Sequence, residues 1–533
     1  MTERPRSLDL DEPLHSISAS GDPLTRVFGL LAFNKPPCVS PSRVASKRFG
    51  YRKDDKQNST FYQYSDIRSL RTRCFAVAVA SASIVFILSP SLATADDVEP
   101  KALPDRIIDV PATKPDPFPA FSNFSWRAFI ALNWPALTGA ADRGQPDRSK
   151  SFGDPGPRVW ETFKSRYEVF QRDRDGRALI PSKWNSYEGN NPCGPGVDNR
   201  TKTLSSFSEF SDFNQATFEL GELGNPLVAQ NRTYTRYEVR INKEEFNSIV
   251  DHKWYARNNL PTAQKPGRFN VGSIGVKAAW RILTDQDTPT IRQRYYVVKD
   301  AAVLDVAKSL QAGIAVCAKK DIALVGFHIV VKTEYRPQWI WSSFEHVDNV
   351  PPIGMGEARE PDANDAHMPY SYNDPTKPQY LAPSLKSPLG NAVSTSNPPK
   401  HDPNPMQVIR QHPINTKIMA MNRAYWALPE IRNTVWANYM LVTTQWPTVT
   451  QPDEPSNSGQ PFPGGFVDPK QPMDVYQLPA KNAGPPSNLA NTTMETYLQA
   501  PSSSCMACHH SVSNAYGRDF VAFMTVKAND PPQ

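Results

Sequence analysis

Two stretches of the chain repeat large apolar residues every three or four positions. They are residues 122–135 (SNFSWRAFIALNWP) and residues 154–170 (DPGPRVWETFKSRYEVF). This spacing predicts two helices that each bury an aromatic face in a core. In the first helix we expect Ser122 or Ser125 to cap the N-terminus and Pro135 to end the helix.

The hydrophobic period changes to two in the next part of the chain. Residues 232–242 (RTYTRYEVRIN), 275–283, 292–300 and 322–333 are predicted strands, and residues 243–255 are a predicted short amphipathic helix between them. Charged residues alternate with apolar ones in the first of these strands. The pattern predicts an antiparallel sheet with inserted helices and one face exposed to solvent.

Proline dominates the connections of the second half. The chain has 52 Pro against 26 Gly, and residues 350–405 and 447–488 are predicted to be long loops. Between them, residues 416–446 predict two helices broken at Pro429, and residues 489–499 predict a last helix. We therefore expect an α+β fold. It would combine a mixed, mostly antiparallel sheet with flanking helices, long Pro-rich loops and a C-terminal attachment segment.

Composition and hydropathy divide the chain into five parts. We expect a polar presequence at 1–73, a signal peptide at 74–95, a helical start and sheet-rich body at 96–345, a loop-rich region with a helix pair at 346–489, and a C-terminal segment at 490–533.

The signal peptide is predicted from an apolar run at residues 74–88. Arginines precede the run, and SPSLATADD follows it with a small-x-small cleavage site before Asp96. The run is shorter than the roughly 20 residues that a membrane helix needs, so we expect no stable membrane anchor after cleavage and a periplasmic or secreted protein. Since a signal normally starts a chain, we expect a start site assigned too far upstream; a cytoplasmic head is the alternative.

Most of the net positive charge lies before the signal. Residues 1–73 hold 13 Lys and Arg and 8 Asp and Glu, out of totals of 59 and 53 that give a net charge of +6. The remaining 46 basic and 45 acidic residues nearly cancel after the signal. A near-neutral exported part has no broad basic field, which argues against nucleic acid as a partner.

Cysteine usage agrees with export. Of six cysteines, four follow the signal, and such economy suits an oxidising compartment. Cys193 and Cys317 remain when the C-terminal pair is set aside, so they are candidates for a structural disulfide, with two buried thiols as the alternative.

The C-terminal pair belongs to the sequence SSSCMACHHSV, in which Cys505, Cys508 and His509 have the spacing C-x-x-C-H. This motif is the attachment signal for haem c, because two thiols add to the haem vinyl groups and the imidazole becomes the proximal iron ligand. A thioredoxin-like redox pair, a zinc site or a plain disulfide are the alternatives.

Through these three residues and the export signal, the chain resembles a c-type cytochrome. The resemblance covers only the last thirty or so residues and implies a cofactor, haem c with its iron, in the segment 490–533. The motif of a small cytochrome opens its domain, whereas here only 24 residues follow His509. The whole chain is similar to large exported single-haem proteins of unassigned role, a likeness that implies no catalytic residues.

The second axial ligand has several candidates. We take Met524 as the metal ligand that complements His509, although it also fits the buried face of a closing strand. Met494, His328 and His346 are the other candidates. An open sixth position would allow peroxidase-like or oxygen chemistry.

Signatures of other chemistry are scarce. The chain contains no G-x-G-x-x-G, Walker loop, H-E-x-x-H or G-x-S-x-G motif. Glu345, His346 and Asp348 could form a general-base cluster, with a solvated turn as the alternative.

These observations predict an exported c-type cytochrome-like protein that binds one haem covalently and transfers electrons to a redox partner protein. One alternative is a haem enzyme with an open distal site, of peroxidase or oxygenase type. The other is a non-haem binding protein with a CxxC disulfide or a zinc site. An oxidoreductase activity is thus possible, and no catalytic residue is assigned.

Overall fold

The computed structural model describes part of the chain. The described residues are 118–205, 227–262, 264–312, 314–334, 336–352, 370–377, 405–410, 413–446, 491–496, 499, 505, 509 and 519–521. The predicted presequence and signal peptide lie outside these ranges, as do Cys508 and Met524. Within these ranges, no helix has the length and apolar character needed to cross a bilayer.

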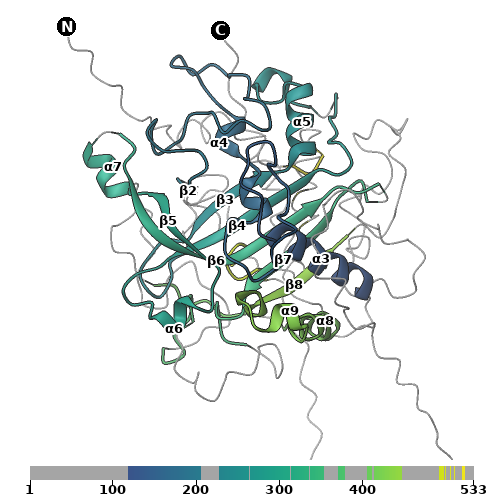
Figure 1. Ribbon diagram of the computed structural model, residues 1–533, viewed down its shortest axis with the longest axis vertical. Helices are drawn as coiled ribbons and strands as arrows, with labels where there is room; N and C mark the ends of the chain where they lie inside the picture. Colours follow the sequence, from purple (N-terminus) through teal and green to yellow (C-terminus); the bar gives the residue numbers. More distant parts are fainter. Residues whose placement is uncertain are drawn as a thin grey trace, which may run out of the picture. The chain divides into compact units, whose positions relative to one another are not determined.

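The described residues form an eight-stranded sheet (Figure 1). Its strands are β1 (Lys164–Ser165), β2 (Thr203–Leu204), β3 (Arg236–Ile241), β4 (Ile274–Ile282), β5 (Val297–Leu304), β6 (Cys317–Val331), β7 (Ile340–His346) and β8 (Tyr439–Gln445). Neighbouring strands are antiparallel except for the short parallel pair β2 and β5. The sheet and the helices around it confirm the predicted α+β class.

The sheet forks along the 15-residue strand β6. One edge of β6 pairs with β4, and the other edge pairs first with β5 and then with β7. At the fork, the Leu324 carbonyl accepts a hydrogen bond from Tyr439 Oη at 2.9 Å, and the Val325 carbonyl accepts one from Asn349 Nδ2 at 2.7 Å. Side chains thus satisfy the buried backbone carbonyls of β6 that lie between its pairing with β5 and its pairing with β7.

Helices and helical turns surround the sheet. They are α3 (Phe118–Asn133), α4 (Arg166–Val169), α5 (Lys243–Asp251), α6 (Pro289–Arg292), α7 (Val306–Ala312), α8 (Thr416–Trp426) and α9 (Pro429–Arg432), with 3₁₀ turns at Val159–Thr162, Arg257–Asn259 and Val435–Asn438. Helices α3 and α8 pack together against the sheet near β8 (Figure 1). Trp126 and Phe129 of α3 contact Phe344 of β7, with ring centroids 5.3 and 4.4 Å apart. An aromatic core therefore fills this side of the sheet.

Helix α3 confirms the first predicted helix, but the predicted caps are wrong. The helix begins at Phe118, so Ser122 and Ser125 lie inside it. Ser125 is fully buried, and its Oγ lies 2.7 Å from Ser342 Oγ and 2.6 Å from Thr444 Oγ1. This serine joins the helix to two strands instead of capping a terminus.

The second predicted helix, over 154–170, is wrong as a single element. The stretch folds as a 3₁₀ turn, strand β1 and the short helix α4. Phe163 is extended, and β1 pairs with β3 at the edge of the sheet. Strand pairing therefore overrides the helical period of the aromatic residues.

Two predictions near the C-terminal half are also wrong. The second helix predicted within 416–446 stops at Arg432, and residues 439–445 form β8, which pairs with β7. All seven are buried, so the apolar and β-branched run YMLVTTQ is a strand inside the sheet. The described residues 491–496 form turns where a helix over 489–499 was expected.

The predicted solvent-exposed face of the 232–242 strand is wrong as well. Arg236, Glu238 and Arg240 of β3 are all buried. Lys202 Nζ and Arg240 Nε lie 2.7 and 2.8 Å from the Glu238 carboxylate. Burial acts to raise the pKa of Glu238, but these two cations outweigh it and the pKa lies below its ordinary value. The charged face is therefore covered by paired charges, not by water.

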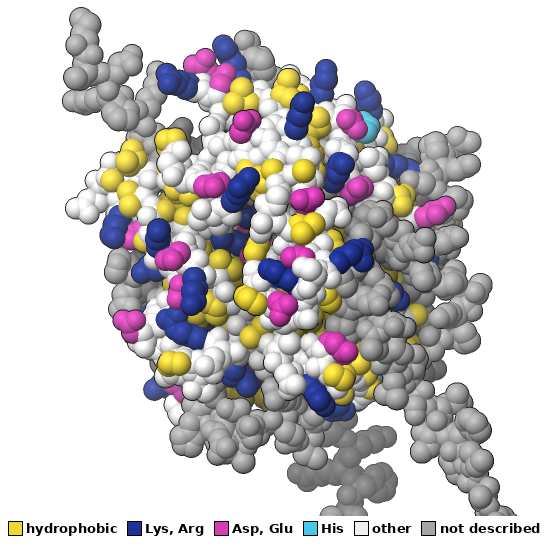
Figure 2. Space-filling model, viewed as in Figure 1, with side chains coloured by type: hydrophobic (Ala, Val, Ile, Leu, Met, Phe, Trp, Pro, Cys, Tyr) yellow, Lys and Arg dark blue, Asp and Glu magenta, His cyan; other side chains and the backbone are white. Residues whose placement is uncertain are grey.

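Charges on the surface alternate in sign. On the face shown in Figure 2, Lys and Arg side chains are interspersed with Asp and Glu side chains, and no single-sign field dominates it. This agrees with the near-neutral composition of the chain after residue 95.

Candidate functional site

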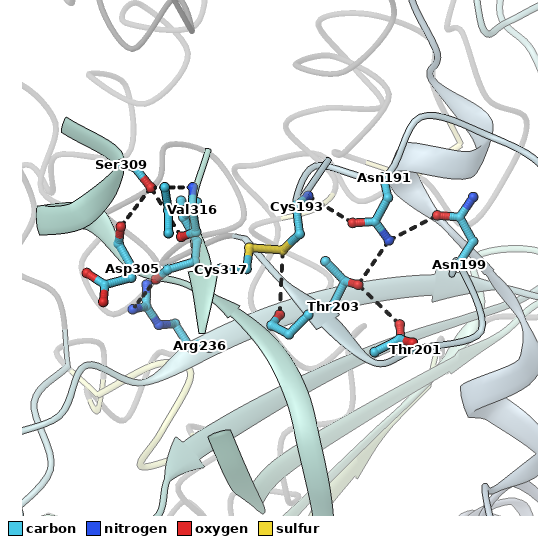
Figure 3. The surroundings of a disulfide bond; sticks show 12 residues. Asn191, Cys193, Asn199, Thr201, Thr203, Arg236, Asp305, Ser309, Val316 and Cys317 are labelled. Atoms are coloured by element: carbon cyan, nitrogen blue, oxygen red, sulfur yellow. Dashed lines mark hydrogen bonds between the residues drawn. A yellow bond between two sulfur atoms is a disulfide. The ribbon is translucent and has the colours of Figure 1, made fainter. Parts of the chain in front are cut away.

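The predicted disulfide between Cys193 and Cys317 is present (Figure 3). Cys193 lies in a loop before β2, and Cys317 is the first residue of β6. The loop is ordered by Asn191, whose Oδ1 accepts from the Cys193 backbone N–H at 2.8 Å and whose Nδ2 donates to Thr203 at 3.1 Å. The disulfide therefore attaches this loop to the central strand.

Residues 491–496, which precede the C-x-x-C-H motif, are bound to one face of β6 and β7. Asn491 Nδ2 donates to the Phe344 carbonyl at 2.8 Å, and Tyr237 Oη donates to the Thr493 carbonyl at 2.9 Å. Gly326 lies directly below, and a Cβ there would clash with Thr493 Oγ1. The close approach of the segment to the sheet thus requires glycine at this position.

A buried ion pair completes this anchor. Glu345 of β7 pairs with Arg410, and the two side chains are 0% and 2% exposed. Glu345 Oε2 also accepts from the backbone N–H and the Oγ1 of Thr492, both at 2.8 Å. Burial lowers the pKa of Arg410 to about 10. Glu345 holds the segment from a fully buried position, and this arrangement favours a structural role over the general-base role considered for it.

His509 of the motif lies against this face. Its ring centroid is 4.4 Å from that of Trp341, and its Nδ1 is 2.7 Å from the Phe520 carbonyl oxygen. A carbonyl only accepts, so Nδ1 carries the proton and the lone pair of the neutral ring is on Nε2. Cys505 lies four residues before His509. It is partly buried and packs against the main core.

These residues fit a haem c. A proximal histidine normally donates its second ring N–H to a backbone carbonyl or carboxylate, which sets the tautomer that leaves the other nitrogen for the metal. His509 has this arrangement, and Cys505 precedes it at the expected spacing. Cys508 and Met524, the other two predicted site residues, lie outside the described residues.

The carbonyl that receives His509 belongs to a tail fragment, residues 519–521. The Asp519 carboxylate accepts from the Phe269 backbone N–H at 2.9 Å and lies 3.0 Å from Lys332 Nζ. Trp339 Nε1 donates to the Asp519 carbonyl at 3.0 Å. Sequence reasoning missed Asp519 and Lys332, because only the fold brings a residue near position 330 next to one near 520.

His328, one of the other candidates for an axial ligand, lies on the same face of the sheet as Trp341. The register of β6 and β7 places Val330 opposite Trp341 and His328 opposite Ser343, and residues two apart on a strand share a face. His328 Nε2 is 3.5 Å from Glu495 Oε2, so the histidine is also linked to the segment before the motif.

His346 is not available to a haem, and the hypothesis that it is an axial ligand is wrong. It is fully buried; its Nδ1 accepts from the Asp348 backbone N–H at 3.1 Å and its Nε2 donates to the Arg294 carbonyl at 3.0 Å. Burial lowers its pKa to about 4. His346 is a neutral structural residue beside the fork of the sheet. Asp348 lies 3.8 Å from His346 Nδ1 and pairs with Arg294, so the carboxylate and the histidine are adjacent but both are held in structural contacts.

Two further observations complete the site. Met494 is 2% exposed and packs in a second apolar cluster with Tyr237 and Val325, against the sheet. In the described part of the chain, no group of three or more His, Cys, Asp or Glu residues is arranged to hold a metal ion.

Comparison with known proteins adds no assignment. No protein-family model matches the chain, and neither the curated proteins nor the solved structures contain a significant match to it.

Proposed function

We propose that the protein is an exported c-type cytochrome-like protein that binds one haem covalently and transfers electrons to a redox partner. Cys505 and Cys508 would hold the haem through thioether bonds, and His509 would be the proximal ligand. When bound, haem c supplies a one-electron couple between ferric and ferrous iron. The observation that carries the proposal is the hydrogen bond from His509 Nδ1 to the Phe520 carbonyl.

That hydrogen bond supports the proposal because it selects one tautomer within a C-x-x-C-H motif. A plain disulfide pair does not require the histidine after the second cysteine to be oriented in this way, whereas a metal bound at Nε2 of His509 does. For a haem, the same bond fixes the ring plane and increases the basicity of Nε2.

The disulfide supports export. A bond between Cys193 and Cys317 forms and persists in an oxidising compartment, which is where haem is attached to c-type cytochromes. The predicted signal peptide at 74–95 and this disulfide are independent features of the chain, and both favour a periplasmic or secreted location.

The anchors on both sides of the motif support a role in electron transfer. Residues 491–496 are hydrogen-bonded to β7, and Asp519 is bonded to Lys332, Trp339 and Phe269. A site supported on both flanks by a rigid sheet keeps its geometry when the charge of the metal changes.

A haem enzyme with an open distal site is the second candidate, and the position of His328 favours it. This histidine shares a sheet face with Trp341 and therefore lies on the side where His509 is held. In the electron-transfer proposal, Met524 would be the second ligand of the haem iron.

Visible spectra of the reduced protein with and without carbon monoxide separate the two candidates. We expect the wild-type spectrum to resist carbon monoxide and Met524→Ala to bind it. Carbon monoxide binding by the wild type would favour the enzyme. His509→Ala should lose the low-spin spectrum, whereas its neighbour variant His510→Ala should keep it, and equal effects of the two would contradict the proximal role of His509.

A further inference from the structure

Two consecutive residues of the tail have a backbone conformation that side chains disfavour. Asp519 has φ of 47° and Phe520 has φ of 66°, both in the left-handed region. Such a conformation costs on the order of 1 kcal/mol or more for each non-glycine residue and persists only where surrounding contacts impose it. The fold therefore maintains this turn against its local preference.

The contacts that impose the turn converge on Asp519. Its carboxylate receives the Phe269 N–H and pairs with Lys332, and its carbonyl receives Trp339 Nε1. The partners lie 250, 187 and 180 residues away in the sequence, and the side chains of Asp519 and Lys332 are 3% and 1% exposed. Phe520 itself is buried in the main core.

The turn has one consequence for the candidate site. It directs the Phe520 carbonyl at His509 Nδ1, 2.7 Å away. We propose that Asp519 is a positioning residue for His509: by holding the left-handed turn, its carboxylate keeps the carbonyl in place and so keeps the ligating nitrogen of His509 unprotonated. The ligating role of His509 in this inference rests on the proposed function, whereas the positioning of His509 by Asp519 does not.

Loss of the carboxylate should therefore change the tautomer of His509. Without the contacts to Phe269 and Lys332, the turn relaxes and Nδ1 loses its acceptor. A neutral imidazole in water prefers the proton on Nε2, which is the nitrogen that a metal requires unprotonated. With haem bound, the weaker hydrogen bond at Nδ1 makes the imidazole less basic and raises the reduction potential.

The first test needs no haem. The full chain, labelled with ¹⁵N-histidine and exported in a host without cytochrome maturation enzymes, is examined by NMR at a pH where imidazole is neutral. The chain has nine histidines, so His509→Ala assigns the signals. We expect the Nδ1–H tautomer to predominate in the wild type and the Nε2–H tautomer to predominate in Asp519→Ala.

Matched variants separate the carboxylate from the backbone. Asp300 is exposed and also has a positive φ, of 53°, so Asp300→Ala should leave the His509 tautomer unchanged. Asp519→Gly removes the backbone strain and should still shift the tautomer. Asp519→Asn keeps an acceptor for Phe269 and should give an intermediate ratio, which also provides a folded variant if the alanine variant unfolds.

The second test uses the haem-loaded protein. Asp519→Ala should raise the reduction potential, with partial return in Asp519→Asn. A wild-type tautomer in both the alanine and the asparagine variants would overturn the inference. If haem fails to attach to the wild type, the proposed function fails, while the NMR test of positioning still stands.

Discussion

Cys193 and Cys317 form a disulfide across 124 residues of sequence, and it joins a loop before β2 to the first residue of the central strand β6. A cross-link that closes so long a loop stabilises the fold chiefly by restricting the unfolded chain.

We predict that the double variant Cys193→Ser and Cys317→Ser lowers the free energy of unfolding by about 2–5 kcal/mol. Chemical denaturation with and without a reducing agent measures this. Reductant should destabilise the wild type and leave the double variant unaffected, and an equal response of the two would contradict a structural role for the bond.

The buried His346 predicts an acid-sensitive fold. Burial lowers its pKa from 6.5 to about 4, so between these values the unfolded state binds a proton that the folded state does not. The stabilisation is fully present above pH 6.5 and falls as the pH is lowered to 4, by about 3 kcal/mol in total. His346→Gln should lack this part of the pH dependence when unfolding is followed from pH 7 to pH 4. An unchanged slope in the variant would place the acid sensitivity elsewhere.

Glu245 on α5 predicts a pH dependence of stability with the opposite sign to that of His346. Burial first, and the charge of Asp519 second, raise its pKa from 4.5 to about 8. The folded state keeps a proton that the unfolded state loses above pH 4.5, so stability falls as the pH rises from 4.5 to 8. Glu245→Gln, which resembles the protonated acid, should gain up to about 5 kcal/mol over the wild type at pH 8 and little at pH 4. Thermal unfolding at the two pH values tests this, with the partly exposed neighbour variant Glu244→Gln as control.

Gly326 allows residues 491–496 to pack closely against the sheet, so a larger residue at this position should disturb that packing. Gly326→Ala would place its Cβ against Thr493 Oγ1, so we expect a loss of about 1–3 kcal/mol and faster proteolysis within 491–496. Thr493→Ala should relieve part of the loss in a double-mutant cycle. Gly196→Ala is the matched control, because nothing lies within 4 Å of a Cβ at that position. Additive effects of the Gly326 and Thr493 variants would show that the two residues do not meet.

Hydrophobic periodicity predicted the elements that bury one stripe of side chains. Helix α3, helix α5 and strands β3, β4 and β6 match predicted elements because each follows a single period. The class of fold could be predicted from the same local patterns. The disulfide could be predicted because only two cysteines remain after the signal once the C-terminal pair is set aside.

Elements that depend on distant partners could not be predicted. The sequence of β8 is compatible with a buried helix, and only its pairing with β7 shows that it is a strand. The sequence of β3 predicts one exposed face, and only the fold shows that Lys202 pairs with Glu238 on that face. The same holds for the site. The motif identifies Cys505 and His509, but only the fold shows that the Phe520 carbonyl, held by Asp519 and Lys332, is the partner of His509.

Covalent haem in the exported chain tests the central claim most directly. The protein is purified from a host with active cytochrome maturation, denatured, and measured by haem staining after gel electrophoresis and by the pyridine haemochrome spectrum, beside the variant Cys505→Ser with Cys508→Ser. We predict one haem for each wild-type chain, retained through denaturation, and none in the variant. Colourless wild-type protein with both C-terminal thiols unmodified would contradict the account.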